Sequence, residues 1–183
     1  MNSANGEIKV AIPVLSTPRL ILRGHTLEDF EASVAIWSDP VVCRYFHGAP
    51  MTREDIWGRL LRTFGMWAAF GYGSWAVEEK ESGDYIGRVG LAEVKRDLDP
   101  ALEGMPEAGW TLAARVHGKG YATEAMQAAL AWTDARLGNK RMFCIISPAN
   151  TASIRVAEKC GFRRWKEVTY KDEPTLIFIR DPK

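Results

Sequence analysis

Two glycines placed immediately before an alanine-rich stretch limit the structures that this chain can adopt more than any other feature of its sequence. The segment RVHGKGYATEAM, residues 115–126, has Gly118 and Gly120 on either side of Lys119, and helical periodicity begins at Tyr121. Small residues allow consecutive backbone N–H groups to turn inward around an anion, and a helix that starts there directs the positive end of its dipole at the same charge. The segment therefore predicts a phosphate-binding turn between a strand and a helix. Taken alone, it is equally compatible with a glycine turn that binds nothing.

Two familiar phosphate-binding motifs do not fit this segment. A nucleotide P-loop requires G-x-x-x-x-G-K-[ST], with its lysine directly before the helix, whereas Lys119 lies between the glycines. A dinucleotide fingerprint requires G-x-G-x-x-G, and GKGYAT has Thr123 at the third position. The pattern that remains is Q/R-x-x-G-x-G/A, matched by Arg115, Gly118 and Gly120.

The periodicity of the rest of the chain predicts an α+β domain. Thr26 with Asp29, and Thr52 with Asp55, resemble capping boxes that open the first two helices. Strands are expected over residues 19–23, 73–79, 85–94, 107–114, 141–147, 164–170 and 175–180. Helices are expected over residues 26–37, 52–67, 121–137 and 151–160. The order is β-α-α-β-β-β-α-β-α-β-β. No repeat or linker interrupts it, so we expect a lead-in over residues 1–16 and a single domain over residues 17–181.

Composition and charge narrow the class of protein further. A formal net charge of +1 gives no general electrostatic case for nucleic acid or an acidic membrane surface. No apolar run approaches the roughly 20 residues that span a bilayer, and no signal pattern opens the chain, so a cytoplasmic protein is expected. The scattered Cys43, Cys144 and Cys160 predict buried or incidental thiols in a reducing compartment. No metal site is expected, because the histidines are equally dispersed at His25, His47 and His117.

A second motif follows the next predicted strand. The segment NTASIRVAEKCGF, residues 150–162, lies one helix and one strand beyond GKGYATEAM. This ordered pair resembles the signature of the GNAT superfamily of acyl-CoA-dependent N-acyltransferases. It is most similar to the ribosomal-protein N-terminal (RimJ/RimL-like) branch, which TPRLILR and SGDYIGRVGL also match. The resemblance covers roughly residues 17–180. It implies the GNAT fold, a mixed and mostly antiparallel twisted sheet of about six or seven strands, flanked by helices, with a V-shaped splay between the two central strands.

The resemblance also implies the cofactor, acetyl-CoA, with coenzyme A as the product. Its pyrophosphate would be held by backbone amides of residues 116–122, and its pantetheine arm by backbone groups of Thr111, Leu112 and Ala113 in the strand before them. Arg115 has two equally weighted roles, as a phosphate ligand or as a brace for the loop. Asn150 is expected to cap its helix and to offer its amide to the pantetheine or to a water, although capping alone would explain the residue type. The cofactor-binding candidates are Thr111, Leu112, Ala113, Arg115, Val116, His117, Gly118, Lys119, Gly120, Tyr121, Ala122, Asn150 and Ser153.

Direct transfer of an acetyl group requires a neutral amine, and amines with a pKa near ~8 to ~10 are mostly protonated at neutral pH. A base is therefore needed, and Glu93 and Glu107 are the candidates at the ends of two predicted strands. The alternative for each is an ordinary solvated carboxylate. Many family members place a tyrosine where this chain has Ala157. Ser153 matches the serine that replaces it in the RimJ/RimL-like branch, with a role in helix capping as the alternative.

The acceptor is not identified by the sequence. The resemblance places its pocket between the first two helices, the loop at residues 95–106 and the final pair of strands. Its aromatic candidates, each individually more typical of a core, are Trp37, Tyr45, Phe46, Trp67 and Trp75. The expected activity is acetylation of a protein N-terminal α-amine or a small-molecule amine by direct attack on the thioester. The alternative is an acyl-CoA-binding sensor or scaffold without turnover. The protein is expected to be a monomer, or a homodimer formed through its last strands.

Overall fold

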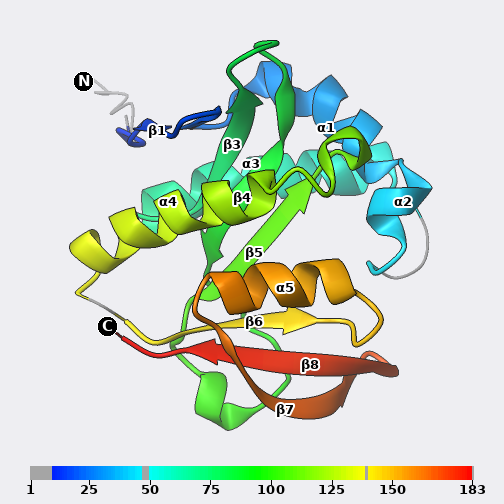
Figure 1. Cartoon of the computed structure of the whole chain (residues 1–183), viewed down its shortest axis with the longest axis vertical. Coiled ribbons are helices and arrows are strands. Elements are labelled where there is room, and N and C mark those ends of the chain that lie inside the picture. Colours follow the sequence, from blue (N-terminus) through cyan, green and yellow to red (C-terminus); the bar gives the residue numbers. More distant parts are fainter. Residues whose placement is uncertain (1–9, 47–49, 139, 183) are drawn as a thin grey trace, which may run out of the picture.

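The computed structural model describes residues 10–46, 50–138 and 140–182, so His47 and most of the lead-in lie outside the described residues. These residues form one eight-stranded sheet in the order β1-β2-β3-β4-β5-β6-β8-β7 (Figure 1). The strands are β1 (Leu15–Ser16), β2 (Leu20–Arg23), β3 (Ser74–Glu79), β4 (Tyr85–Ala92), β5 (Glu107–Leu112), β6 (Met142–Ile146), β7 (Arg163–Tyr170) and β8 (Glu173–Arg180). The α-helices are α1 (Phe30–Trp37), α2 (Pro40–Cys43), α3 (Arg53–Phe70), α4 (Tyr121–Arg136) and α5 (Thr151–Lys159).

The sheet is antiparallel except at its centre. Six register pairs join β4 to β5, and five join β6 to β8. Between them, the parallel strands β5 and β6 share a single pair, Glu107 with Phe143. Beyond that pair the two strands diverge, and Figure 1 shows β5 rising away from β6. The expected splay between the central strands is therefore present.

Helices cover both faces of the sheet. In Figure 1, α4 and α5 lie in front of the strands, and α3 lies behind them. The main apolar core fills the space between α4, α5 and the sheet, and its largest fully buried side chains include Trp75, Phe162 and Phe178. A second core cluster joins α1, the α2 segment and α3 through Trp37, Cys43 and Ile56. The clusters are not confined to one helix each, because Trp67 near the end of α3 joins the main core and packs against Trp132 of α4, with ring centroids 5.6 Å apart.

Most element boundaries follow the local signals in the sequence. Thr52 caps α3 by accepting a hydrogen bond from the Asp55 N–H at 3.1 Å, and Gly71 ends that helix with φ 71°. The Thr26 capping box also forms, although a 3₁₀ turn (Leu27–Asp29) precedes α1. Two short elements were not predicted, strand β1 and helix α2. Strand β1 supplies the eighth strand, one more than the sequence suggested, because two-residue strands carry no periodicity.

His25 is a buried side chain whose two ring nitrogens have no hydrogen-bond partner among the described residues. Burial, reinforced by the charge of Arg88, lowers the pKa of His25 from 6.5 to about 3, so the folded protein keeps the ring neutral. An unfolded chain takes up a proton near pH 6.5. The stability that neutral His25 contributes is therefore complete above that pH and is lost as the pH falls toward 3.

We expect the free energy of unfolding to decrease by up to about 1.4 kcal/mol per pH unit below pH ~6, before most carboxylates titrate. Urea unfolding at a series of pH values measures this slope. The variant His25→Gln removes the titrating group and should flatten the slope between pH ~6 and pH ~5. An equal slope in the variant would show that another group is responsible.

Candidate active site

The turn between β5 and α4 leaves backbone donors unused. Gly118 and Gly120 adopt left-handed conformations, with φ 77° and φ 81°. Neither of their N–H groups donates to an acceptor within the described residues. The first N–H groups of a helix also have no partner inside it, which adds those of Tyr121 and Ala122. A side chain added at Gly118 would meet no atom within 4 Å, so space is open beside these donors.

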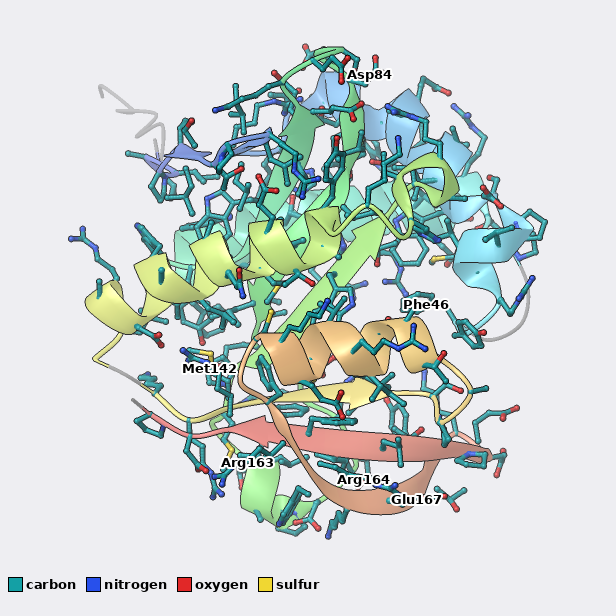
Figure 2. The ribbon with its side chains drawn as sticks, viewed as in Figure 1. Phe46, Asp84, Met142, Arg163, Arg164 and Glu167 are labelled. Carbon is teal, nitrogen blue, oxygen red and sulfur yellow. The ribbon has the colours of Figure 1, made fainter. Side chains whose placement is uncertain are left out.

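Arg115 braces this turn against the neighbouring hairpin. Its guanidinium pairs with Glu79 at 3.0 Å and with Asp84 at 2.8 Å. Asp84 lies at the tip of the β3–β4 hairpin (Figure 2). Glu79 also accepts a hydrogen bond from the Tyr121 hydroxyl at 2.9 Å, and these contacts, led by Arg115, lower the pKa of Glu79. Of the two roles weighed for Arg115, the geometry favours the brace.

Arg19 is a second brace, which sequence analysis did not identify. It pairs with Glu124 in the first turn of α4 at 2.6 Å, and it donates to the Lys119 carbonyl at 2.8 Å. Its guanidinium also lies over the Tyr121 ring, 4.3 Å from the centroid. No local signal reveals these contacts, because about 100 residues separate the partners. Together the two arginines hold the glycine turn at the mouth of the splay.

Three other residues predicted for the turn, Val116, His117 and Lys119, differ in burial and in what they could offer a ligand. Val116 is buried in the core, so only its backbone is available to a ligand. His117 is exposed, and its Nε2 lies 2.9 Å from the Leu112 carbonyl oxygen. Lys119 is exposed beside the glycines, where its ammonium is free to approach a phosphate.

Strand β5 directs alternate backbone groups toward the splay. The Ala113 N–H donates to the Ile86 carbonyl on the β4 side at 2.8 Å, so by alternation the backbone of Thr111 also faces β4. The backbone groups of Trp110 and Leu112 face the opposite edge, where β6 has diverged. This changes the predicted cofactor contacts, because Thr111 and Ala113 have no backbone donor free for a pantetheine.

Helix α5 places Ser153 across the splay from β5. Asn150 caps the helix, its side chain accepting from the Ser153 N–H at 3.1 Å. The Ser153 hydroxyl accepts a hydrogen bond from the Trp110 indole N–H at 3.3 Å, which links α5 to β5. Ala157, at the position of the usual tyrosine, is fully buried and has no polar group to offer. Ser153 is therefore the hydroxyl that the α5 motif brings to the splay.

The two candidate bases lie side by side in the sheet but differ in their partners. Ala92 at the end of β4 pairs with Glu107, so Glu93 follows directly beside it. Glu107 receives two hydrogen bonds from Arg96, one of them at 2.7 Å, and its charge is neutralised. Among the described residues, Glu93 accepts a side-chain hydrogen bond only from the neutral Tyr72 hydroxyl, at 2.5 Å. Burial and the contact with Glu93 together raise the pKa of Tyr72. Glu93 also lines a cavity of about 430 Å³ under the loop that joins β4 to β5.

The predicted pocket aromatics divide into two groups. Trp67 and Trp75 are buried in the core, with ring centroids 4.8 Å apart, and cannot line a pocket. Trp37 is also buried but contacts the half-buried Phe46, with centroids 5.2 Å apart. Phe46 projects below the α2 segment, on the side of the molecule where α5 begins (Figure 2).

The site thus combines a glycine turn with unused backbone N–H groups, a splayed pair of strands and a polar helix start. Residues 19–163 match the family model described as an acetyltransferase (GNAT) domain. The chain belongs to this family. The mixed, mostly antiparallel sheet flanked by helices is the fold class that the two motifs predicted.

Individual relatives agree with the family match. The chain is 30% identical to the uncharacterized protein YkkB of Bacillus subtilis over 91% of its length and 94% of that relative. A putative GNAT-family acetyltransferase structure from Bordetella pertussis is 31% identical, with a TM-score of 0.81 over 92% of this chain and 99% of the other. The structure of AAC(6')-Ib in complex with paromomycin and acetyl-CoA shares the fold at 23% identity, with a TM-score of 0.69 over 88% and 93% of the two chains.

The cysteines, the potential metal ligands and the helix lengths of the described residues can be compared with what the sequence predicted. Cys43, Cys144 and Cys160 are buried free thiols, and the burial agrees with the prediction. No three His, Cys, Asp or Glu side chains in the described part of the chain are grouped so that they could hold a metal ion. Among residues 10–46, 50–138 and 140–182, no helix is both long enough and apolar enough to cross a membrane.

Proposed function

We propose that this protein is an acetyl-CoA-dependent N-acetyltransferase of the RimJ/RimL-like branch, acting in the cytoplasm on a primary amine. The observation that carries the proposal is the set of unpaired N–H groups at Gly118, Gly120 and the start of α4, which faces open space at the mouth of the splay. Such a set is suited to a pyrophosphate. The assignment to the RimJ/RimL-like branch rests on the residues of the two sequence motifs. The cytoplasmic location is supported by the buried free thiols, which are typical of a reducing compartment.

Acetyl-CoA supplies the thioester whose carbonyl carbon the amine attacks. In our proposal, the N–H groups of Gly118, Gly120, Tyr121 and Ala122 bind the pyrophosphate, and Lys119 adds its charge at the rim. The backbone groups of Trp110 and the Leu112 N–H, which face the splay, pair with the pantetheine, while the Leu112 carbonyl oxygen is in contact with the His117 ring. Arg115 acts through Glu79 as a positioning residue, because its guanidinium is already engaged.

Proton transfer is assigned to two side chains on opposite sides of β5. Glu93 accepts a proton from the attacking amine, directly or through water, because no cation neutralises it among the described residues. Glu107 is held by Arg96 and serves to position the loop that lines the cavity. The Ser153 hydroxyl stabilises or protonates the departing thiolate from the start of α5.

Calorimetric titration with acetyl-CoA, ATP and NAD tests the proposal. We expect micromolar binding of acetyl-CoA alone, followed by release of CoA thiol when an amine acceptor is added. Well-folded protein that does not bind acetyl-CoA would refute the proposal. Binding without turnover across a broad amine panel would favour the acyl-CoA sensor instead.

Replacing Ser153 with alanine should reduce kcat by roughly tenfold or more while acetyl-CoA affinity stays within about twofold. The backbone N–H that Asn150 caps is retained in this variant, so the start of α5 is preserved. Trp110→Phe is the matched comparison, since it removes the donor to Ser153 and leaves the hydroxyl in place. Equal losses in both variants would show that Ser153 acts only through its contact with Trp110.

A further inference from the structure

A group of three arginines lies on the face of the sheet opposite to α4 and α5. Arg59 and Arg62 come from α3, and Arg88 comes from the middle of β4. Arg59 and Arg88 both line a small cavity against Trp37, with guanidinium carbons 4.8 Å and 5.8 Å from its ring centroid. Arg62 is exposed at the edge of the group. We call these three residues the arginine cluster.

The arginine cluster has no anionic partner of its own. Within the described residues, none of the three guanidinium groups forms an ion pair or a hydrogen bond, although Arg59 and Arg88 are half-buried. Burial, followed by the charges of the neighbouring arginines, lowers the pKa of Arg59 to about 10. Asp55 acts electrostatically on Arg59 and Glu107 acts on Arg88, but neither pairs with the cluster, and Glu107 is already paired with Arg96. Like charges left together without a counter-ion favour an anion that binds from outside.

The arginine cluster lies next to the middle of β5, the strand along whose diverging edge the acceptor amine would approach the thioester. Arg88 is the register partner of Thr111, and Gly90 is the partner of Gly109, two residues along β5 toward Glu107. Gly109 is exposed, and a side chain added there would meet nothing within 4 Å. The middle of β5 is therefore uncovered on this face, and Gly109 is a diagonal cross-strand neighbour of Arg88, about 7–8 Å away. Trp110, next to Gly109, contacts Ser153 on the other face.

Resting on the acetyltransferase function proposed above, we infer that Arg59, Arg62 and Arg88 bind an anionic group of the acceptor, a carboxylate or a phosphate carried a few bonds from the reacting amine. Guanidinium groups are suited to both anions. The acceptor then lies over Gly109, with its amine at the diverging edge of β5 and its anion on the arginine cluster. A polycation such as an aminoglycoside would meet like charge here, so this class of acceptor is disfavoured.

The experiment compares amines that differ only in the anion. Calorimetry on the CoA-saturated protein is run with O-phosphoethanolamine against ethanolamine, and with the peptide Asp-Ala-Ala-amide against Asn-Ala-Ala-amide. At least one anionic compound should bind about tenfold or more tightly than its neutral partner. The first pair reports a small-molecule acceptor and the second a protein N-terminus. The preference should decrease to within about twofold in Arg88→Met and in Arg59→Met.

Two variants of exposed side chains, which should not disturb folding, separate a loss of anion binding from a loss of structure. Arg62→Gln changes an exposed side chain and should weaken the preference, whereas Arg136→Gln, on the exposed surface of α4, should leave it unchanged. Equal affinities within both pairs, no binding of either anionic compound, or a preference that persists in all three cluster variants would overturn the inference. Repeating the titrations without CoA separates the two proposals. Acetyl-CoA binding without anion preference refutes only the arginine cluster, and anion binding without acetyl-CoA binding refutes only the acetyltransferase function.

Discussion

Replacing Gly120 with glutamate should weaken acetyl-CoA binding by at least about 100-fold, because like charges brought together at a binding site cost several kcal/mol. The substitution places a carboxylate beside the unpaired N–H groups that we assign to the pyrophosphate. An added Cβ would contact only Arg19 Nη2, at 3.5 Å, so the side chain fits the unliganded protein. The expected loss is therefore one of affinity, measured by calorimetric titration, rather than one of folding.

Backbone strain is the competing explanation, since Gly120 has φ 81°. Gly138 has φ 67° at the opposite end of α4, and a side chain added there would meet nothing within 4 Å. Gly138→Glu therefore introduces the same charge under similar strain and should bind acetyl-CoA normally. If Gly120→Glu retains wild-type affinity in a folded protein, the pyrophosphate is not bound at this turn.

Replacing Gly87 with alanine should destabilise the protein by about 3 kcal/mol or more. Gly87 has φ 138°, which side-chain-bearing residues rarely adopt. Its Cβ would lie 2.2 Å from the Thr111 carbonyl oxygen and 2.8 Å from the Leu112 Cα. Both are backbone atoms of β5, so neither can move without shifting the strand that borders the splay. Urea unfolding of the variant measures the loss.

Gly109→Ala is the matched control for this effect. It also adds one methyl group to the β4–β5 pair, but its Cβ would meet nothing within 4 Å. We expect its stability to remain within about 1 kcal/mol of the wild type. Comparable losses in both variants would show that the close approach at Gly87 is not the cause.

Local signals in the sequence predict most of the elements correctly. The Thr52 and Asn150 caps form where residue type indicates, and the glycine turn adopts the conformation that its spacing implies. Strand β1 and helix α2 are the exceptions, because each is too short for periodicity to be read. Short-range chemistry is visible in a sequence since the interacting groups are only a few residues apart.

The candidate site is predicted less completely. Sequence motifs single out the backbone donors and Ser153, but they assign Thr111 and Ala113 to the pantetheine, although the backbone of both residues faces β4. The direction of a backbone group depends on strand register, which one chain segment alone does not specify. The distinction between Glu93 and Glu107 likewise depends on Arg96, which neutralises only one of them.

The sequence by itself determined the family and the place of the glycine turn, because two glycines and a helix start act over a few adjacent residues. Only the tertiary structure decided that Arg115 and Arg19 brace that turn. It alone also brought Arg59, Arg62 and Arg88 together without a counter-ion. These arrangements join segments distant in the chain, and their energies depend on burial and charge proximity that exist only once the sheet and helices have packed.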